Sequence, residues 1–236
     1  MASSTYKPVT HCIFDMDGLL LDSEQIYFEC YDEVLKELGH RYTYEMANRL
    51  RGAARISTAK IVVESYGLSI APDEFLRRLD AILPQKLANC RLMPGADRLV
   101  RHLHKHKVPI AIATGSSLEY VRIKTEQHQD FIKLFNHIVS GSDDLEVKES
   151  KPAPDVFLVC ARRFAPPLEG PEACVKALVF EDAPNGVRAA IAAGMQVVMV
   201  PDPLAVQPEQ KKEATLCIDC LEDFKPELFG LPPFDK

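Results

Sequence analysis

Two carboxylates stand two residues apart in the tetrapeptide Asp15-Met16-Asp17-Gly18. The apolar run at 11–14 before them is typical of a short buried strand, which Gly18 breaks. Because side chains alternate along a strand, Asp15 and Asp17 should leave its end on the same side and repel each other. A divalent cation would resolve this repulsion, and hard carboxylate oxygens are the ligands that Mg²⁺ prefers. Taken alone, the tetrapeptide is equally consistent with an acidic turn.

Thr114-Gly115-Ser116 follows a second apolar run, at 109–113. A hydroxyl followed by small residues lets backbone N–H groups close around an anion. Lys151 follows an acidic loop and is itself followed by prolines that fix the backbone at the start of a predicted helix, so the lysine is held in a defined direction. The alternatives are an ordinary polar turn and a solvated lysine beside acids.

A second acidic pair, Glu181-Asp182, ends the apolar run at 177–180. Asn185 follows the pair and is predicted to be the N-cap of a helix at 186–193. In an open sheet of parallel strands, ligands bind beyond the carboxyl ends of the strands. We therefore expect both acidic pairs, the hydroxyl turn and the lysine to gather at one edge of a sheet.

Apolar runs separated by helical patterns predict βαβ units and a parallel sheet. The expected strands are 12–14, 109–113, 138–139, 177–180 and 196–200, with a short late strand within 214–221.

The interval between the first and second strands holds about ninety residues with helical periodicity only. The expected helices are 23–38, 43–50, 56–66 and 72–88, and Gly39, Gly52 and Gly67 punctuate them. Since a crossover normally needs one helix, this excess predicts an inserted all-helical domain.

The composition limits the classes of partner. The chain has 236 residues, a hydrophobic fraction of 47% and a formal charge of −6, which argues against a nucleic acid polymer as partner. No apolar run is long enough to span a membrane, and the first residues lack the apolar core of a signal peptide. Seven scattered cysteines fit free thiols in a reducing compartment, so the cytosol is the expected location.

Two further groups invite a metal or redox interpretation that we do not favour. Cys217 and Cys220 form a lone C-x-x-C without a second ligand pair, so we expect ordinary thiols. His102, His104 and His106 alternate with other residues at a charged helix end, where cations are favourable. We expect that helix end to be solvated.

The four strand-end motifs, in this order, resemble those of the haloacid dehalogenase superfamily of phosphotransferases. Segments 14–24, 92–96, 151–157 and 179–187 are similar to the subgroup with small sugar-phosphate phosphatases and β-phosphoglucomutase, and 192–202 and 224–232 to one nucleotide phosphatase within it. The resemblance implies an α/β fold in which 1–19 and 93–236 form a Rossmann-like parallel sheet core. Residues 20–92 would form an inserted helical-bundle cap.

The same resemblance implies hydrolysis of a phosphate monoester through an aspartyl-phosphate. It makes Asp15 the nucleophile and Asp17 the acid and base. Mg²⁺ would be held by Asp15, the backbone carbonyl of Asp17 and Asp182, with Glu181 orienting water on the metal. The implied phosphate-binding residues are Thr114, Gly115, Ser116, Lys151 and Asn185.

Three arginines, Arg49, Arg51 and Arg55, surround Gly52 in the insert. Arg55 stands where the mutase relatives carry a cap arginine that contacts the substrate, so the resemblance implies the same role here. A solvent-facing residue in the first turn of a helix is the alternative.

Two other functions share these motifs. A phosphomutase would pass the phosphate from the aspartate to a second sugar hydroxyl. A catalytically silent interaction protein could keep the fold, but it would not need a proton-transferring Asp17. We expect a monomer that acts on a small phosphorylated metabolite.

Overall fold

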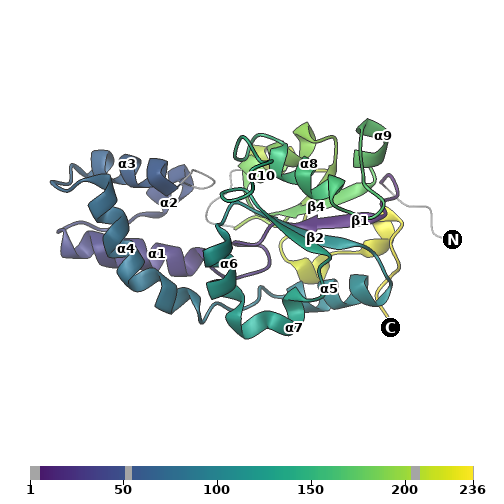
Figure 1. The fold of residues 1–236 in the computed structure, drawn as a ribbon, viewed down its shortest axis with the longest axis horizontal. Helices are drawn as coiled ribbons and strands as arrows, with labels where there is room; N and C mark the ends of the chain where they lie inside the picture. Colours follow the sequence, from purple (N-terminus) through teal and green to yellow (C-terminus); the bar gives the residue numbers. More distant parts are fainter. Residues whose placement is uncertain (1–5, 51–54, 203–207, 236) are drawn as a thin grey trace.

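The computed structural model describes residues 6–50, 55–202 and 208–235. Within them, a six-stranded parallel sheet runs in the order β3-β2-β1-β4-β5-β6 and confirms the predicted α/β class (Figure 1). The strands are β1 His11–Phe14, β2 Ile110–Thr114, β3 His137–Ser140, β4 Ala177–Glu181, β5 Gln196–Met199 and β6 Leu216–Cys217. The chain builds the sheet outward from β1, first to one side and then to the other, so the strand order reverses between β1 and β4.

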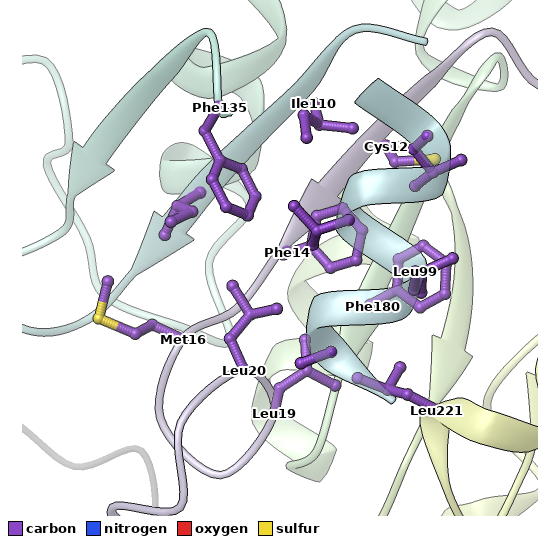
Figure 2. Packing of buried hydrophobic residues seen from close by; sticks show 14 of the residues in the cluster. Cys12, Phe14, Met16, Leu19, Leu20, Leu99, Ile110, Phe135, Phe180 and Leu221 are labelled. Carbon is purple, nitrogen blue, oxygen red and sulfur yellow. The ribbon is translucent and has the colours of Figure 1, made fainter. Parts of the chain in front are cut away.

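Alternating residues of the central strand serve two apolar cores. Ile13 belongs to the core on one face of the sheet, whereas Cys12 and Phe14 belong to the core on the other. Phe14 lies opposite Phe180 of β4, and their rings stack with centroids 4.6 Å apart. Figure 2 shows Phe14 and Phe180 packed with Leu99 and Leu221 on one face of the sheet. Burial on both faces explains why these strands appear as continuous apolar runs rather than alternating ones.

Helices cover both faces of the sheet (Figure 1). One face carries α5 Ala96–Lys105, α7 Gln129–Ile132 and the C-terminal tail, residues 221–235. The other face carries α8 Asp155–Arg162, α9 Pro171–Cys174 and α10 Pro184–Ala192. The remaining core elements are α6 Leu118–Thr125, α11 Pro208–Lys211 and the short 3-10 helices η1 Glu126–His128, η2 Leu221–Asp223 and η3 Pro226–Phe229.

Among the described residues between β1 and α5, four helices form what we call the helical insert, which projects beyond one end of the sheet (Figure 1). They are α1 Glu24–Glu37, α2 Tyr44–Leu50, α3 Arg55–Tyr66 and α4 Pro72–Leu87, each within two residues of the helix expected. Their apolar faces meet in a separate cluster that includes Val34, Phe75 and Leu79. The two connections to the sheet are joined by backbone hydrogen bonds, because Met93 N donates to Leu20 O at 2.9 Å.

The C-terminal tail corrects one expectation about the histidines. His102 is buried rather than solvated, and its Nε2 lies 2.9 Å from the carbonyl oxygen of Pro232. The ring of Phe234 packs on His102 with centroids 4.6 Å apart. The tail covers His102, whereas His104 and Lys105 in the same turn of α5 remain exposed.

Candidate active site

The site lies where the strand order reverses, at the carboxyl ends of β1 and β4. Asp15 directly follows β1, Glu181 is the last residue of β4, and Asp182 comes next. All three side chains are buried, and each offers a carboxylate oxygen within 4.8 Å of the others. The parallel strands β1 and β4 therefore bring Asp15 beside Glu181 and Asp182, which are far away in the sequence.

Lys151 reaches this cluster from the loop between β3 and α8. Its Nζ lies 2.5 Å from Asp15 Oδ1 and 2.6 Å from Glu181 Oε1, and it donates to the carbonyl of Ala113 at 3.2 Å. Burial alone would lower the pKa of Lys151, but the carboxylates of Asp15 and Glu181 raise it well above its ordinary value. Burial raises the pKa of Asp15 to about 7, against the opposing charge of Lys151. Lys151 is thus a fixed cation beside the carboxylate of Asp15.

Asp17 is held by three side chains. It accepts hydrogen bonds from Ser23 Oγ at 2.6 Å and Ser116 Oγ at 2.7 Å, and Lys124 Nζ lies 2.5 and 2.6 Å from its two carboxylate oxygens. Lys124 also donates to Ser116 Oγ at 2.7 Å. Burial opposes ionisation of Asp17, but Lys124 and the two hydroxyls hold its pKa below the ordinary value.

Lys124 and Ser23 are site residues that the sequence analysis missed. Lys124 belongs to α6, where it is buried together with Val121 and Thr125. A lysine three residues after a buried valine falls on the inner face of a short helix, and an isolated lysine there needs an acidic partner. That spacing was the available signal, but it does not identify Asp17 as the partner.

The hydroxyl turn after β2 is arranged by its own hydrogen bonds. Thr114 is fully buried, and its Oγ1 accepts from the Ser116 amide at 3.1 Å. Ser140 Oγ donates to the Ser116 carbonyl at 2.7 Å, which ties the turn to the end of β3. Ser117 Oγ then caps α6 by accepting from Tyr120 N. The turn is therefore rigidly placed beside Asp17.

Two glycines allow the acidic residues to approach the backbone. Gly18 has a φ of +78°, and a Cβ there would lie 2.5 Å from Asp182 Oδ2. A Cβ on Gly186 would lie 1.9 Å from Glu181 Oε1, so no other residue fits without moving that carboxylate.

Asn185 is not the N-cap that its position suggested. The helix α10 begins at Pro184, and Ala183 takes the cap position with extended backbone angles. Proline favours the first helical position, because its fixed φ suits the helix and its missing N–H needs no partner there. Asn185 therefore lies in the first turn of α10.

One cavity of about 760 Å³ brings together the residues of the four strand-end motifs and Arg55. This site cavity is lined by Asp15, Asp17, Arg55, Thr114, Gly115, Ser116, Lys151, Glu181, Asp182 and Asn185.

The sequence model of the haloacid dehalogenase-like hydrolases matches residues 12–200. The chain belongs to this family. A probable pseudouridine-5′-phosphatase of Drosophila melanogaster is 49% identical over 99% of both chains. The (DL)-glycerol-3-phosphatase 2 of Arabidopsis thaliana is 45% identical over 96% of this chain and 93% of its own. A solved β-phosphoglucomutase of Clostridium difficile shares the fold, with a TM-score of 0.72 and 20% identity over 93% of this chain and 94% of its own.

These relatives confirm the predicted enzyme class of this haloacid dehalogenase-like protein, a hydrolase of phosphoric monoesters. Asp15, Glu181 and Asp182 could hold a hard divalent cation, since their donor atoms are all carboxylate oxygens. Within the described ranges, no helix combines the length and apolar character that crossing a membrane requires.

Arg55 opens α3 and connects the helical insert to α6 in this haloacid dehalogenase-like fold. Its guanidinium pairs with Asp80 of α4, and its Nη1 donates to the hydroxyl of Tyr120 on α6 at 2.7 Å. The Tyr120 hydroxyl donates in turn to Asp80 Oδ1 at 2.8 Å. Arg55 thus borders the site cavity with several of its donors already engaged, whereas Arg51 and Gly52 lie outside the described residues.

Proposed function

We propose that the enzyme hydrolyses pseudouridine 5′-phosphate to pseudouridine and phosphate in a Mg²⁺-dependent reaction. The observation that carries a phosphatase mechanism is the meeting of Asp15, Asp17 and Lys151 in one cavity. The identity of 49% along the whole chain with the Drosophila relative supports the choice of substrate.

In the first proposed step, a carboxylate oxygen of Asp15 attacks phosphorus and the bond from phosphorus to the ribose 5′-oxygen breaks. Asp17 gives a proton to that leaving oxygen. Lys151 faces Asp15 and would contact the equatorial phosphoryl oxygens, together with Thr114 and the turn after it. Asp15 is left as an aspartyl-phosphate.

In the second step, water attacks the same phosphorus and the bond to Asp15 breaks. Asp17 takes the proton from this water, so it returns to the state in which it began the cycle. One residue can serve both steps, because the leaving oxygen and the attacking water occupy the same position.

Asp15, Asp182 and the backbone carbonyl of Asp17 would hold Mg²⁺, with Glu181 beside them. When bound, the ion would offset the negative charge that meets the incoming phosphate. Lys151 supplies a second positive charge at the same place.

We also propose that residues 20–92 act as a cap over a core formed by 1–19 and 93–236. The motif residues after Asp17 lie outside the insert, whereas Tyr27, Tyr31 and Arg55 of the insert line the site cavity. A cap of this kind excludes water and selects the leaving group. Arg55 is a proposed contact to that group through the N–H donors that Asp80 and Tyr120 leave available.

A steady-state panel tests this function. It compares pseudouridine 5′-phosphate, uridine 5′-phosphate, FMN and glycerol 3-phosphate, with and without Mg²⁺. The proposal expects the highest kcat/KM with pseudouridine 5′-phosphate and no turnover after chelation. A preference for glycerol 3-phosphate would overturn the substrate, and phosphate transfer from a sugar bisphosphate to a second sugar would identify a phosphomutase. Asp15→Asn is the inactive control.

A further inference from the structure

A second cavity, of about 460 Å³, lies between the helical insert and the acidic edge of the sheet. We call it the aromatic cavity, because its lining includes Tyr27, Phe28, Tyr31, Tyr42 and Tyr44. At its other end it reaches Gly18 and Asp182, and it shares Tyr27, Tyr31 and Asp182 with the site cavity. A substrate whose phosphate sits at Asp15 can therefore extend its leaving group into this space.

The rings of the aromatic cavity form a connected row. Phe28 stacks on Tyr44 with centroids 4.5 Å apart and an interplanar angle of 21°, and it lies 5.1 Å from Tyr42. Tyr42 stacks in turn on Tyr31 at 5.0 Å. Tyr44 is 46% exposed although it is large and aromatic, so its ring is not buried in the apolar core of the insert. Aromatic faces of this kind bind other flat rings, nucleobases included, by stacking.

The charged residues in the described lining of the aromatic cavity are all acidic. Five carboxylates line it, and no Lys, Arg or His is found among the described residues of its lining. Such a cavity repels a leaving group that carries a second phosphate. Asn48 and Thr58 add an amide and a hydroxyl to the lining, and these groups can pair with the polar edge of a heterocycle.

We infer that the aromatic cavity binds the leaving group of the substrate and that this group ends in an uncharged planar heterocycle, a nucleobase. The inference rests on the proposed function and deepens it, because it assigns base recognition to the rings around Tyr44 rather than to Arg55. It also separates this enzyme from one that acts on glycerol phosphates or sugar bisphosphates, whose leaving groups lack a flat uncharged ring.

The test compares kcat/KM for pseudouridine 5′-phosphate with that for ribose 5-phosphate, which has the same leaving oxygen but no base. Tyr44→Ala should lower the preference for the nucleotide roughly tenfold, as expected for a lost stacking partner. Tyr44→Phe keeps the ring and should retain the preference. Phe28→Leu provides a second disruption of the row, and Tyr66→Ala, an aromatic change in the insert away from the cavity lining, is the matched control.

The inference is overturned if Tyr44→Ala and Phe28→Leu lower both substrates equally or change neither. It is also overturned if the parent enzyme prefers ribose 5-phosphate or glycerol 3-phosphate. If the parent instead prefers uridine 5′-phosphate or FMN and Tyr44→Ala removes that preference, the proposed substrate fails while the ring-binding cavity stands. If no phosphate ester is hydrolysed, calorimetric binding of pseudouridine to the parent and not to Tyr44→Ala would still support the cavity, and its absence would reject it.

Discussion

Lys124 Nζ lies 2.5 Å from one carboxylate oxygen of Asp17 and 2.6 Å from the other, and the lysine side chain is fully buried. Because Lys124 favours the ionised form of Asp17, the aspartate is set up as the base that the second step of the proposed mechanism needs. To act as the acid in the first step, Asp17 must gain a proton against this charge. Through its effect on the pKa of Asp17, Lys124 therefore affects both proposed roles of this aspartate, general acid and general base.

Lys124→Met should lower kcat by roughly 10–100-fold, less than the roughly 10²–10⁴-fold that a general acid or base contributes, because Asp17 itself remains. Removing the cation raises the pKa of Asp17, so the acid limb of the pH–kcat profile should move to higher pH. Lys124→Arg keeps the charge and should retain the position of that limb. A profile that stays in place in Lys124→Met, with only a lower melting temperature, would show that the lysine serves folding alone.

Asp17→Asn should separate the two proton transfers. The variant keeps the backbone carbonyl at position 17, but its side-chain amide cannot protonate a leaving group. Because p-nitrophenolate needs little protonation to leave, single-turnover phosphorylation of Asp15 should slow far less with p-nitrophenyl phosphate than with a ribose 5′-phosphate. Breakdown of the aspartyl-phosphate still needs the base, so the difference should appear in the burst and not in the steady state. Equal losses with both leaving groups in rapid-quench measurements would argue against Asp17 as the acid.

Asp15 should make the metal-free protein less stable as the pH rises. Its pKa in the folded protein is raised to about 7 by burial, above the value of an exposed aspartate. The folded state therefore keeps a proton that the unfolded state releases, and stability falls between about pH 4 and pH 7 and then levels off. Asp15→Asn removes this titration, so in EDTA its advantage in free energy of unfolding over the parent should grow by roughly 1–3 kcal/mol from pH 5 to pH 8.

Denaturant unfolding at the two pH values measures this change. Asp32→Asn is a suitable control, because Asp32 is a surface carboxylate whose pKa is lowered by a hydrogen bond from Arg41. Asp32 is ionised in the folded and unfolded states throughout this range, so the effect of that variant on the free energy of unfolding should not change between pH 5 and pH 8. A parallel response of the two variants would contradict the assignment to Asp15.

The contact of Arg55 with Tyr120 allows two roles of the arginine to be told apart. If Arg55 binds the leaving group, Arg55→Ala should raise KM for pseudouridine 5′-phosphate roughly tenfold, the effect of about 1.4 kcal/mol of binding, and leave p-nitrophenyl phosphate turnover nearly unchanged. Tyr120→Phe removes only the hydroxyl that bridges α3, α4 and α6. Similar losses of kcat in the two variants, on both substrates, would instead indicate that Arg55 holds the insert against α6.

The fold could be predicted from the sequence because β1, β2 and β4 are continuous apolar runs. Each ends in a motif, so the topology of a parallel sheet was enough to place Asp15, Thr114 and Glu181 at one edge. The partner of Asp17 could not be predicted in this way. Lys124 approaches from the side of a helix, and its contact depends on how α6 packs, which no strand-end pattern records.

The start of α10 shows a different limit. Asn185 is a good N-cap residue by type, yet Pro184 before it is an even stronger signal for the first helical position, and the two compete over adjacent residues. His102 stands three residues after the buried Leu99, which favours the inner face of α5, but this spacing does not reveal the tail that returns from the far end of the chain to cover it.

The position of the insert between β1 and β2 has a consequence for how the chain is made. The central strand emerges from the ribosome first, but both of its neighbours, β2 and β4, come after the whole insert. The helices α1, α3 and α4 meet partners that are much closer in sequence, and contacts of this kind form early. During synthesis, the apolar strand β1 is therefore unpaired while the helices of the insert pack against each other. The site cavity can form only after β4 has been synthesised, because Glu181 and Asp182 stand at the end of that strand.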